Sequence, residues 1–249
     1  MNIQTEAGLA ITPLVLTHNE EANIGRTLAG LQWARRVVVL DSGSTDATQT
    51  IASAFCNVDW YTRAFDSFRE QCDYGIHQTC IQTDYVLALD ADMATPPELV
   101  TEIEQKFLPG GYDGGWLHFQ YRMMGLPLVG SLYPAQARIF KPDKVSVQQV
   151  GHGHKFVLFG NAYRFKAQLI HDDRKTLERW VMAQLSYSAK EQQRIEEGVS
   201  LRWRDWLRRS GLMPWLIGAL AYIKAGGPWR GAAAVCYANE RAAYECLLA

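Results

Sequence analysis

Two carboxylates stand one residue apart at Asp90 and Asp92, directly after the apolar run Tyr85–Leu89. The run predicts a buried strand, and the two acids would then lie at its carboxyl end. In an open α/β sheet, ligands bind outside that end of the strands. Carboxylate oxygens suit Mg²⁺ or Mn²⁺, and such a metal suits a diphosphate. The spacing therefore predicts a site for a metal and a diphosphate.

Two other apolar runs also end in polar residues. Residues 11–16 are followed by Thr17-His18-Asn19-Glu20, and residues 36–40 are followed by the segment from Asp41 to Asp46. Each segment alone fits a capped turn. Three such ends in this order indicate a binding edge, where Asp41 could accept a hydrogen bond from a base N–H such as the imide of uracil. Neither a glycine-rich dinucleotide fingerprint nor a P-loop follows the first strand.

The first 110 residues alternate between predicted strands and helices, which is typical of a mainly parallel sheet covered by helices. We expect strands at 11–16, 36–40, 58–61 and 85–89, and helices at 20–33, 46–55, 68–82 and 97–107. Further strands are expected at 115–121, 137–141, 155–158 and 163–170, with fewer helices between them. From residue 175 onward the chain is predicted to be helical. The expected domains are a catalytic domain at 1–195 and a helical extension at 196–249.

Composition narrows the classes of protein. The 249 residues carry 25 basic and 26 acidic side chains, so the net charge of −1 does not indicate a nucleic-acid partner. The cysteines number five and include no Cys-x-x-Cys pair, which favours reduced thiols over a disulfide framework or a zinc site. The N-terminus lacks the basic start of a signal peptide. These features predict a cytoplasmic protein, with peripheral contact at the inner face of the cytoplasmic membrane as an open possibility.

Several segments resemble known signatures. THNEEANI at 17–24, DSGSTDATQ at 41–49 and LALDADM at 87–93 resemble the three signatures of family 2 glycosyltransferases. The segments at 133–140 and 171–175 resemble later parts of the branch that includes lipopolysaccharide core glucosyltransferases. The resemblance spans roughly residues 10–195. It implies the GT-A fold, an α/β architecture with a mixed, mainly parallel sheet flanked by helices, here with a C-terminal helical extension.

The resemblance also implies roles for individual residues. Asp90, Asp92 and His171 would hold the metal, with Asp92 the most direct ligand, and Arg138 would neutralise the departing diphosphate. Ordinary structural roles compete with these: Arg138 could pair with an acid, and His171 could be a satisfied side chain at a strand end. The nucleotide would be lined by Thr17, Asn19, Glu20, Asp41, Ser42, Gly43, Asp46, Arg69, Asp90 and Ala91.

The sequence departs from the family pattern in two places. Cys72 stands where relatives often carry a basic residue, so Arg69 is the alternative basic contact to the nucleotide. The stretch at 150–158 lacks the carboxylate that often acts as catalytic base. The candidates for the base are His152, His154, Asp172 and Asp173, or another acid brought in by folding.

The function predicted is an inverting, Mn²⁺- or Mg²⁺-dependent transfer of a hexose from a nucleotide sugar, with a UDP-sugar favoured. The acceptor would be a hydroxyl of a cell-envelope glycan or glycolipid, such as a lipopolysaccharide core. A decayed nucleotide-sugar-binding protein is the alternative. A nucleotidyltransferase is disfavoured because THNEEAN is not the glycine-rich, arginine-bearing loop of that class. The stretch at 123–134, rich in Gly and Pro, is expected to close over the donor.

The C-terminal segment combines basic and aromatic residues. It contains Arg202, Arg204, Arg208 and Arg209 together with Trp203, Trp206, Trp215 and Trp229. One interpretation is a pair of helices at a membrane surface. The other is that these helices pack on the catalytic domain or on a second subunit.

Overall fold

The computed structural model describes residues 9–150, 153–196 and 202–248. These residues form two compact units. The first consists of residues 9–119, 135–149 and 154–174, and the second consists mainly of residues 120–134 and the chain from 175 onward. The helix at 177–196, which the sequence analysis placed in the catalytic domain, therefore groups with the helices that follow it.

The first unit is built around four parallel strands in the order β3-β2-β1-β4. Their bounds are β1 Ile11–Thr17, β2 Val37–Asp41, β3 Val58–Thr62 and β4 Tyr85–Asp90. The residues of β2 are all buried, as expected for a parallel sheet covered on both faces. The register places Thr17 beside Asp41 and Leu16 beside Asp90. Because these strands are parallel, their polar ends meet at one edge of the sheet.

Antiparallel strands extend the sheet beyond β4. β8 (Gln136–Phe140) pairs with β4, β6 (Gly114–Met123) pairs with β8, and β11 (Ala162–His171) follows β6 in the sheet. The two-residue strand β5 (Met93–Ala94) then pairs with β11, so that His171 lies beside Met93. The remaining strands are β7 (Leu126–Pro127), paired with β6, and a separate hairpin of β9 (Val145–Val150) and β10 (Gly153–Leu158).

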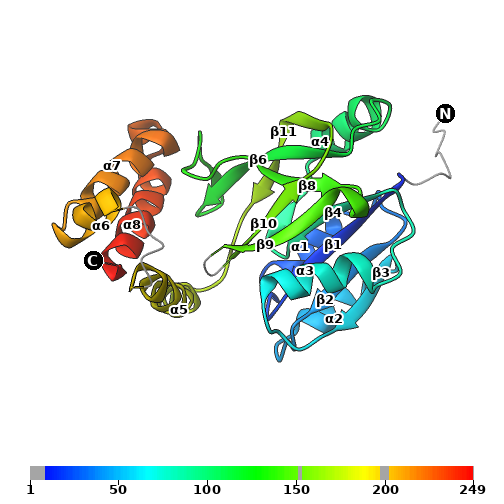
Figure 1. The fold of residues 1–249 in the computed structure, drawn as a ribbon, viewed down its shortest axis with the longest axis horizontal. Helices are drawn as coiled ribbons and strands as arrows, with labels where there is room; N and C mark the ends of the chain where they lie inside the picture. The colour runs from blue at the N-terminus through cyan, green and yellow to red at the C-terminus, as the bar shows by residue number, and fades with distance from the viewer. Residues whose placement is uncertain (1–8, 151–152, 197–201, 249) are drawn as a thin grey trace. The chain divides into compact units, whose positions relative to one another are not determined.

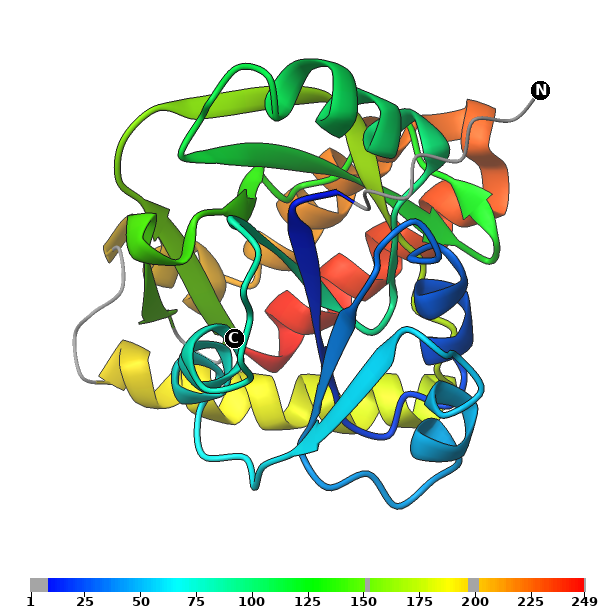
Figure 2. The same cartoon turned by 90° about the vertical axis from the view of Figure 1, so that its right-hand side faces the viewer.

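Helices cover both faces of the parallel strands. α1 (Ile24–Ala29) and α2 (Thr48–Ala52) lie on one face and α3 (Phe68–His77) lies on the other (Figure 2). Cys72 and Ile76 of α3 join a buried apolar cluster with Leu14, Val38 and Phe140. α4 (Pro97–Glu102) continues as a π-helix over Ile103–Phe107. The helices expected at 20–33 and 46–55 are shorter than predicted, because loops at residues 19–23 and 42–47 take their first turns.

The second unit contains α5 (Leu177–Glu196), α6 (Arg202–Arg209), α7 (Met213–Ala225) and α8 (Gly231–Leu247), with a 3₁₀ turn at Gly227–Arg230 (Figure 1). α7 and α8 pack side by side through buried alanines, and a Cβ placed on Gly218 would lie 3.3 Å from the Cβ of Ala242. Residues 123–134, which were expected to close over the donor, are hydrogen-bonded to α7 and α8. The Val129 N–H donates to the carbonyl of Ala225, and the Leu132 N–H donates to the hydroxyl of Tyr237.

One buried ion pair links α6 to α8. The Arg208 guanidinium donates to the Glu245 carboxylate at 2.9 Å, and each side chain is only 7% exposed. Because removal of one partner leaves the other charge buried without its counter-charge, Glu245→Gln should lower the free energy of unfolding by about 3 kcal/mol or more. Urea denaturation followed by tryptophan fluorescence measures this. Glu240→Gln, which weakens an ion pair at 3.9 Å, is the control and should cost less than about 1 kcal/mol. Equal midpoints for the two variants would contradict the assignment.

Candidate functional site

The carboxyl edge of the parallel strands is formed by two loops that hold each other. The Asp41 carboxylate, which is buried, accepts hydrogen bonds from the backbone N–H groups of Gly43 (2.9 Å) and Ser44 (2.8 Å) and from the Ser44 hydroxyl. Gly43 has a φ of +89°, which suits glycine. Asn19, at a φ of +54°, donates its backbone N–H to the Ser44 hydroxyl and accepts from the Thr45 N–H. Asp41 and Asn19 therefore shape the edge.

Two more of the expected nucleotide-binding acids also make bonds within these loops. Asp46 accepts from the backbone N–H of Glu21 at 3.2 Å and from that of Thr48 at 3.0 Å. Glu20 accepts from the side-chain amide of Asn23 at 2.8 Å. The hydroxyl of Thr17, at the end of β1, differs: it is buried and has no hydrogen-bond partner in the structure as described. A ligand is one partner that this hydroxyl could take.

Asn23 joins these loops to the end of β11. Its side chain is fully buried, and its amide nitrogen donates to Glu20 and to Asp173, the latter at 2.9 Å. Its amide oxygen accepts from the Arg26 guanidinium at 2.6 Å and from the Arg174 N–H at 3.0 Å. The Asn23 amide thus makes four hydrogen bonds. Three of them go to residues of the segments at 17–24 and 171–175, and the fourth goes to Arg26 of α1.

Asp172 lies between two guanidinium groups. Its Oδ2 accepts from Arg26 and from Arg174, each at 2.9 Å, and its side chain is largely buried. The Asp172 N–H also donates to the carbonyl of Asp92 at 3.0 Å. Because two guanidinium groups already bind this carboxylate oxygen, the geometry favours a positioning role for Asp172. Asp173 is exposed and accepts from Asn23.

The structure brings together two of the three predicted metal ligands. Nε2 of His171 lies 3.6 Å from Oδ2 of Asp92, and both side chains are partly shielded from solvent. Mn²⁺ can bind both a carboxylate and an imidazole, and Mg²⁺ can bind the carboxylate. Among the described residues, no three His, Cys, Asp or Glu side chains are gathered in a ready-made cluster. The pair could contribute two ligands to a divalent cation.

Asp90, the third predicted metal ligand, faces Arg138. The guanidinium of Arg138 is buried, donates to Asp90 at 3.2 Å and to Gln136 at 2.9 Å, and lies 5.5 Å from the ring centre of Phe119. Burial by itself raises the pKa of Asp90, but the charge of Arg138 and its hydrogen bond to Asp90 help to bring the pKa below its usual value. In this structure Arg138 is paired with Asp90, and its contact with a diphosphate stays a prediction.

His154 lies beside Asp90 and Arg138 in an aromatic pocket. Its ring centre is 4.9 Å from that of Phe156 and 5.6 Å from that of Phe68. Burial, with a smaller contribution from Arg138, lowers the pKa of His154 to about 4. General bases work best with a pKa near the operating pH, so the structure disfavours His154 as the base. His152, the other histidine candidate, lies outside the described residues.

Arg69, expected as the basic contact to the nucleotide, is exposed in the first turn of α3 and lies 3.9 Å from Glu70. Arg63, the first residue after β3, is a second basic residue at the carboxyl edge, where its N–H donates to the carbonyl of Asp41. Its guanidinium donates to the buried Gln71, which donates in turn to the hydroxyl of Ser42. Arg63 could have been identified from the sequence, because it directly follows a strand, as the polar residues after β1, β2 and β4 do.

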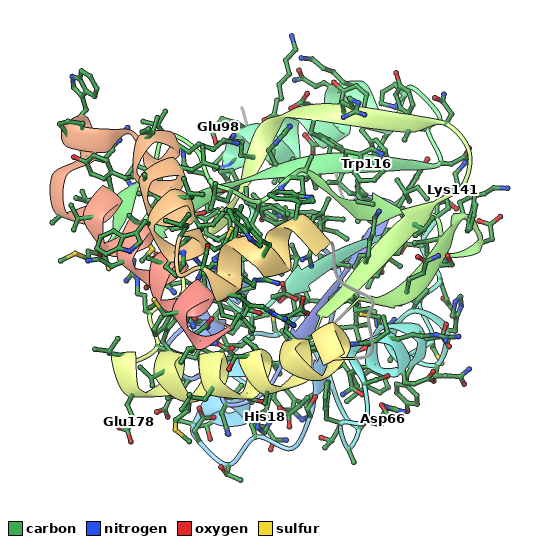
Figure 3. The ribbon with its side chains drawn as sticks, turned by 60° about the vertical axis from the view of Figure 1, so that its left-hand side comes forward. His18, Asp66, Glu98, Trp116, Lys141 and Glu178 are labelled. Atoms are coloured by element: carbon green, nitrogen blue, oxygen red, sulfur yellow. The ribbon has the colours of Figure 1, made fainter. Side chains whose placement is uncertain are left out.

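Figure 3 shows that residues following the parallel strands lie at one end of the sheet. His18 and Asp66, which follow β1 and β3, lie toward one end of the strands, and Lys141, which follows the antiparallel β8, lies toward the other. Of the remaining predicted residues, Ala91 contributes its carbonyl, which accepts from the hydroxyl of Thr27 at 2.6 Å. Most of the predicted site residues are therefore collected at one edge, but many are engaged with one another.

Comparison with known proteins identifies this edge. Residues 14–128 match the model of the family described as Glycosyl transferase family 2. An uncharacterized glycosyltransferase of Rickettsia bellii (strain RML369-C) is 28% identical over 152 residues, which are 61% of this chain. The same residues are 48% of that protein, so the chain spans about half the length of this curated relative.

Solved structures confirm the fold class. TarS of S. aureus, residues 1–349 in complex with UDP-GlcNAc, aligns with a TM-score of 0.53 at 14% identity, over 73% of this chain and 66% of that one. The same protein in complex with UDP aligns with a TM-score of 0.52 at 13% identity, over 96% and 90% of the two chains. The first unit has the GT-A fold that the sequence predicted.

The low pKa of His154 predicts a pH dependence of stability. The pKa is about 4 in the folded chain and about 6.5 when unfolded, so the unfolded chain binds the proton more tightly between these values. Stability is then fully present above pH 6.5 and falls as the pH drops toward 4, by up to about 3 kcal/mol from this group. Urea denaturation of the wild type and of His154→Gln across this range measures the difference. The variant should lose less stability on acidification.

The control for this measurement is His77→Gln, because His77 is 45% exposed. This variant should follow the wild type at every pH. Parallel curves for the wild type and His154→Gln would contradict the assignment of a buried, neutral imidazole.

Proposed function

We propose that the chain transfers a hexose from a nucleotide sugar, preferably a UDP-hexose, to a hydroxyl group with inversion at the anomeric carbon. The observation that carries the proposal is the pairing of Asp92 with His171 at the carboxyl edge of a glycosyl transferase family 2 domain. The TarS structures support a uridine diphosphate donor, since their complexes contain UDP-GlcNAc or UDP.

Asp92 and His171 would hold Mn²⁺ or Mg²⁺ against the diphosphate of the donor. When bound, the cation supplies positive charge that stabilises the departing nucleoside diphosphate. The ion pair with Arg138 would fix the orientation of the Asp90 carboxylate beside the cation. Arg138 then acts on the site by holding Asp90.

The nucleotide would lie along the loops after β1 and β2. The unpartnered hydroxyl of Thr17 is available for a hydrogen bond to it. Asp41, Asn19 and Asp46 would act mainly by keeping the two loops in one shape, because each of them bonds to backbone N–H groups there. A preformed edge of this kind loses little conformational entropy when the nucleotide binds.

Transfer requires a base that takes the proton of the acceptor hydroxyl as its oxygen attacks the anomeric carbon and the bond to the diphosphate breaks. Among the candidates, Asp172 is held by two guanidinium groups and His154 has a low pKa. Asp173 is an exposed carboxylate two residues after His171 and is the candidate that the geometry favours. A positioned base of this kind contributes on the order of 10²–10⁴-fold.

The acceptor proposed is a hydroxyl of a cell-envelope glycan or glycolipid, as in a lipopolysaccharide core. This finer assignment is supported by the resemblance of residues 133–140 and 171–175 to that branch of the family. A lipid-linked acceptor would be met at a membrane surface, and the exposed tryptophans of the second unit are compatible with such contact.

Titration calorimetry with UDP, with and without Mn²⁺, tests the donor site. Wild type should bind UDP more tightly with Mn²⁺, and Asp92→Asn should lose at least about tenfold of the Mn²⁺-dependent affinity, because a charged ligand of the cation is removed. Asp84→Asn is the matched control, since Asp84 is exposed just before β4, at the other end of that strand. It should bind as the wild type does.

Binding that ignored both Mn²⁺ and the Asp92 substitution would contradict the proposed site. Turnover assays with a panel of UDP-hexoses separate an enzyme from a decayed binding protein. Intact Mn²⁺-dependent UDP binding without any release of UDP from a donor would favour the decayed protein.

A further inference from the structure

α7 exposes a row of large apolar side chains. Trp215 is 80% exposed and Ile223 is 71% exposed, and the tryptophan after the helix, Trp229, is 89% exposed. We call this row the α7 face; it consists of Leu212, Trp215, Leu216, Leu220, Ile223 and Trp229. Within the helix the residues recur every three or four positions, so they form one continuous stripe.

The opposite side of α7 is already used for packing. Ala221 and Ala225 are fully buried, and Gly218 lies against Ala242 of α8. The helix is therefore apolar on the side that packs on α8 and apolar on the side that faces solvent. Singly exposed apolar residues are common, but a contiguous exposed stripe of this size marks an interaction surface.

The chain segment that carries the α7 face has charges of one sign only. From Trp206 to Gly231 the sequence contains no Asp or Glu, and it contains four basic residues. Arg208 is buried with Glu245, whereas Arg209 and Lys224 are exposed and Arg230 is partly exposed. The segment that forms the face is thus positively charged, which favours an anionic partner.

We propose that the α7 face binds the surface of a lipid bilayer that carries anionic head groups. Tryptophans are favoured at the boundary between head groups and acyl chains, and basic side chains are attracted to anionic lipids. α7 has 13 residues, or about 20 Å of helix, against a hydrocarbon core of about 30 Å. None of the described helices combines the length and the apolar character that crossing a membrane requires. α7 would therefore lie in the plane of the surface.

A second copy of the chain fits this face less well. In a twofold-symmetric dimer formed through the α7 face, Arg209, Lys224 and Arg230 of one copy would come near the same cations of the other copy. The face provides no carboxylate in the stretch 206–231 to compensate for that repulsion. An anionic bilayer satisfies both the apolar and the charged parts of the surface. This inference rests on the proposed function in one respect: binding to a membrane would bring the chain to a lipid-linked acceptor.

Co-sedimentation of the full chain with vesicles tests the proposal. Vesicles of phosphatidylcholine with about one third phosphatidylglycerol should bind the wild type, and pure phosphatidylcholine vesicles should bind it at least about tenfold more weakly. The double variant Trp215→Ser/Ile223→Ser should lose about tenfold or more of the partition coefficient. Leu177→Ser/Met182→Ser, which changes two exposed apolar residues of α5, is the control and should bind as the wild type does.

The charged part is tested with Arg209→Gln/Lys224→Gln, which should weaken binding to the anionic vesicles and reduce its sensitivity to salt. Lys106→Gln/Lys144→Gln in the first unit is the matched control and should change neither. Calorimetry with UDP and Mn²⁺ on the Trp215→Ser/Ile223→Ser variant separates this proposal from the proposed function, because nucleotide binding should be unchanged.

Three results would overturn the proposal. The wild type could fail to sediment with anionic vesicles, or the Trp215→Ser/Ile223→Ser variant could sediment as well as the wild type. Sedimentation equilibrium could also show a wild-type dimer that this double variant dissociates, without any binding to vesicles. The last result would assign the α7 face to contact between two copies of the chain.

Discussion

The candidate site depends on the hydrogen bonds that close the end of β11 onto α1. Asn23 and Arg26 of the first loop and helix bind Asp172, Asp173 and Arg174, which lie about 150 residues later in the chain. A buried amide left with several unmet partners costs several times the net value of one hydrogen bond. This closure holds the segment that contains His171, and the pairing of β11 with β5 then sets His171 near Asp92.

The two acids that stand one residue apart have different surroundings. Asp90 is paired with the buried Arg138, which lies between aromatic rings, and the charges around it favour its ionised form. Asp92 lies near His171, whose imidazole can share a cation with it. The edge thus contains one acid paired with an arginine and one acid beside an imidazole.

Sequence alone could predict the features that depend on local patterns. The apolar runs of β1, β2 and β4 and the turn residues after them are local, so the strands and their polar ends were predicted correctly. Distant contacts could not be predicted: β5 has two residues and exists because β11 pairs with it, and Asp172 is a positioning residue because Arg26 reaches it. The low pKa of His154 arises from burial among rings that its own segment does not reveal.

Anomalous diffraction from crystals grown with UDP and Mn²⁺ tests whether Asp92 and His171 hold the metal. We expect a manganese peak within about 2.3 Å of both a carboxylate oxygen of Asp92 and a ring nitrogen of His171, with the diphosphate completing the coordination. A bound UDP with the manganese peak elsewhere, or with no peak at these two side chains, would contradict the assignment of Asp92 and His171 as the metal site.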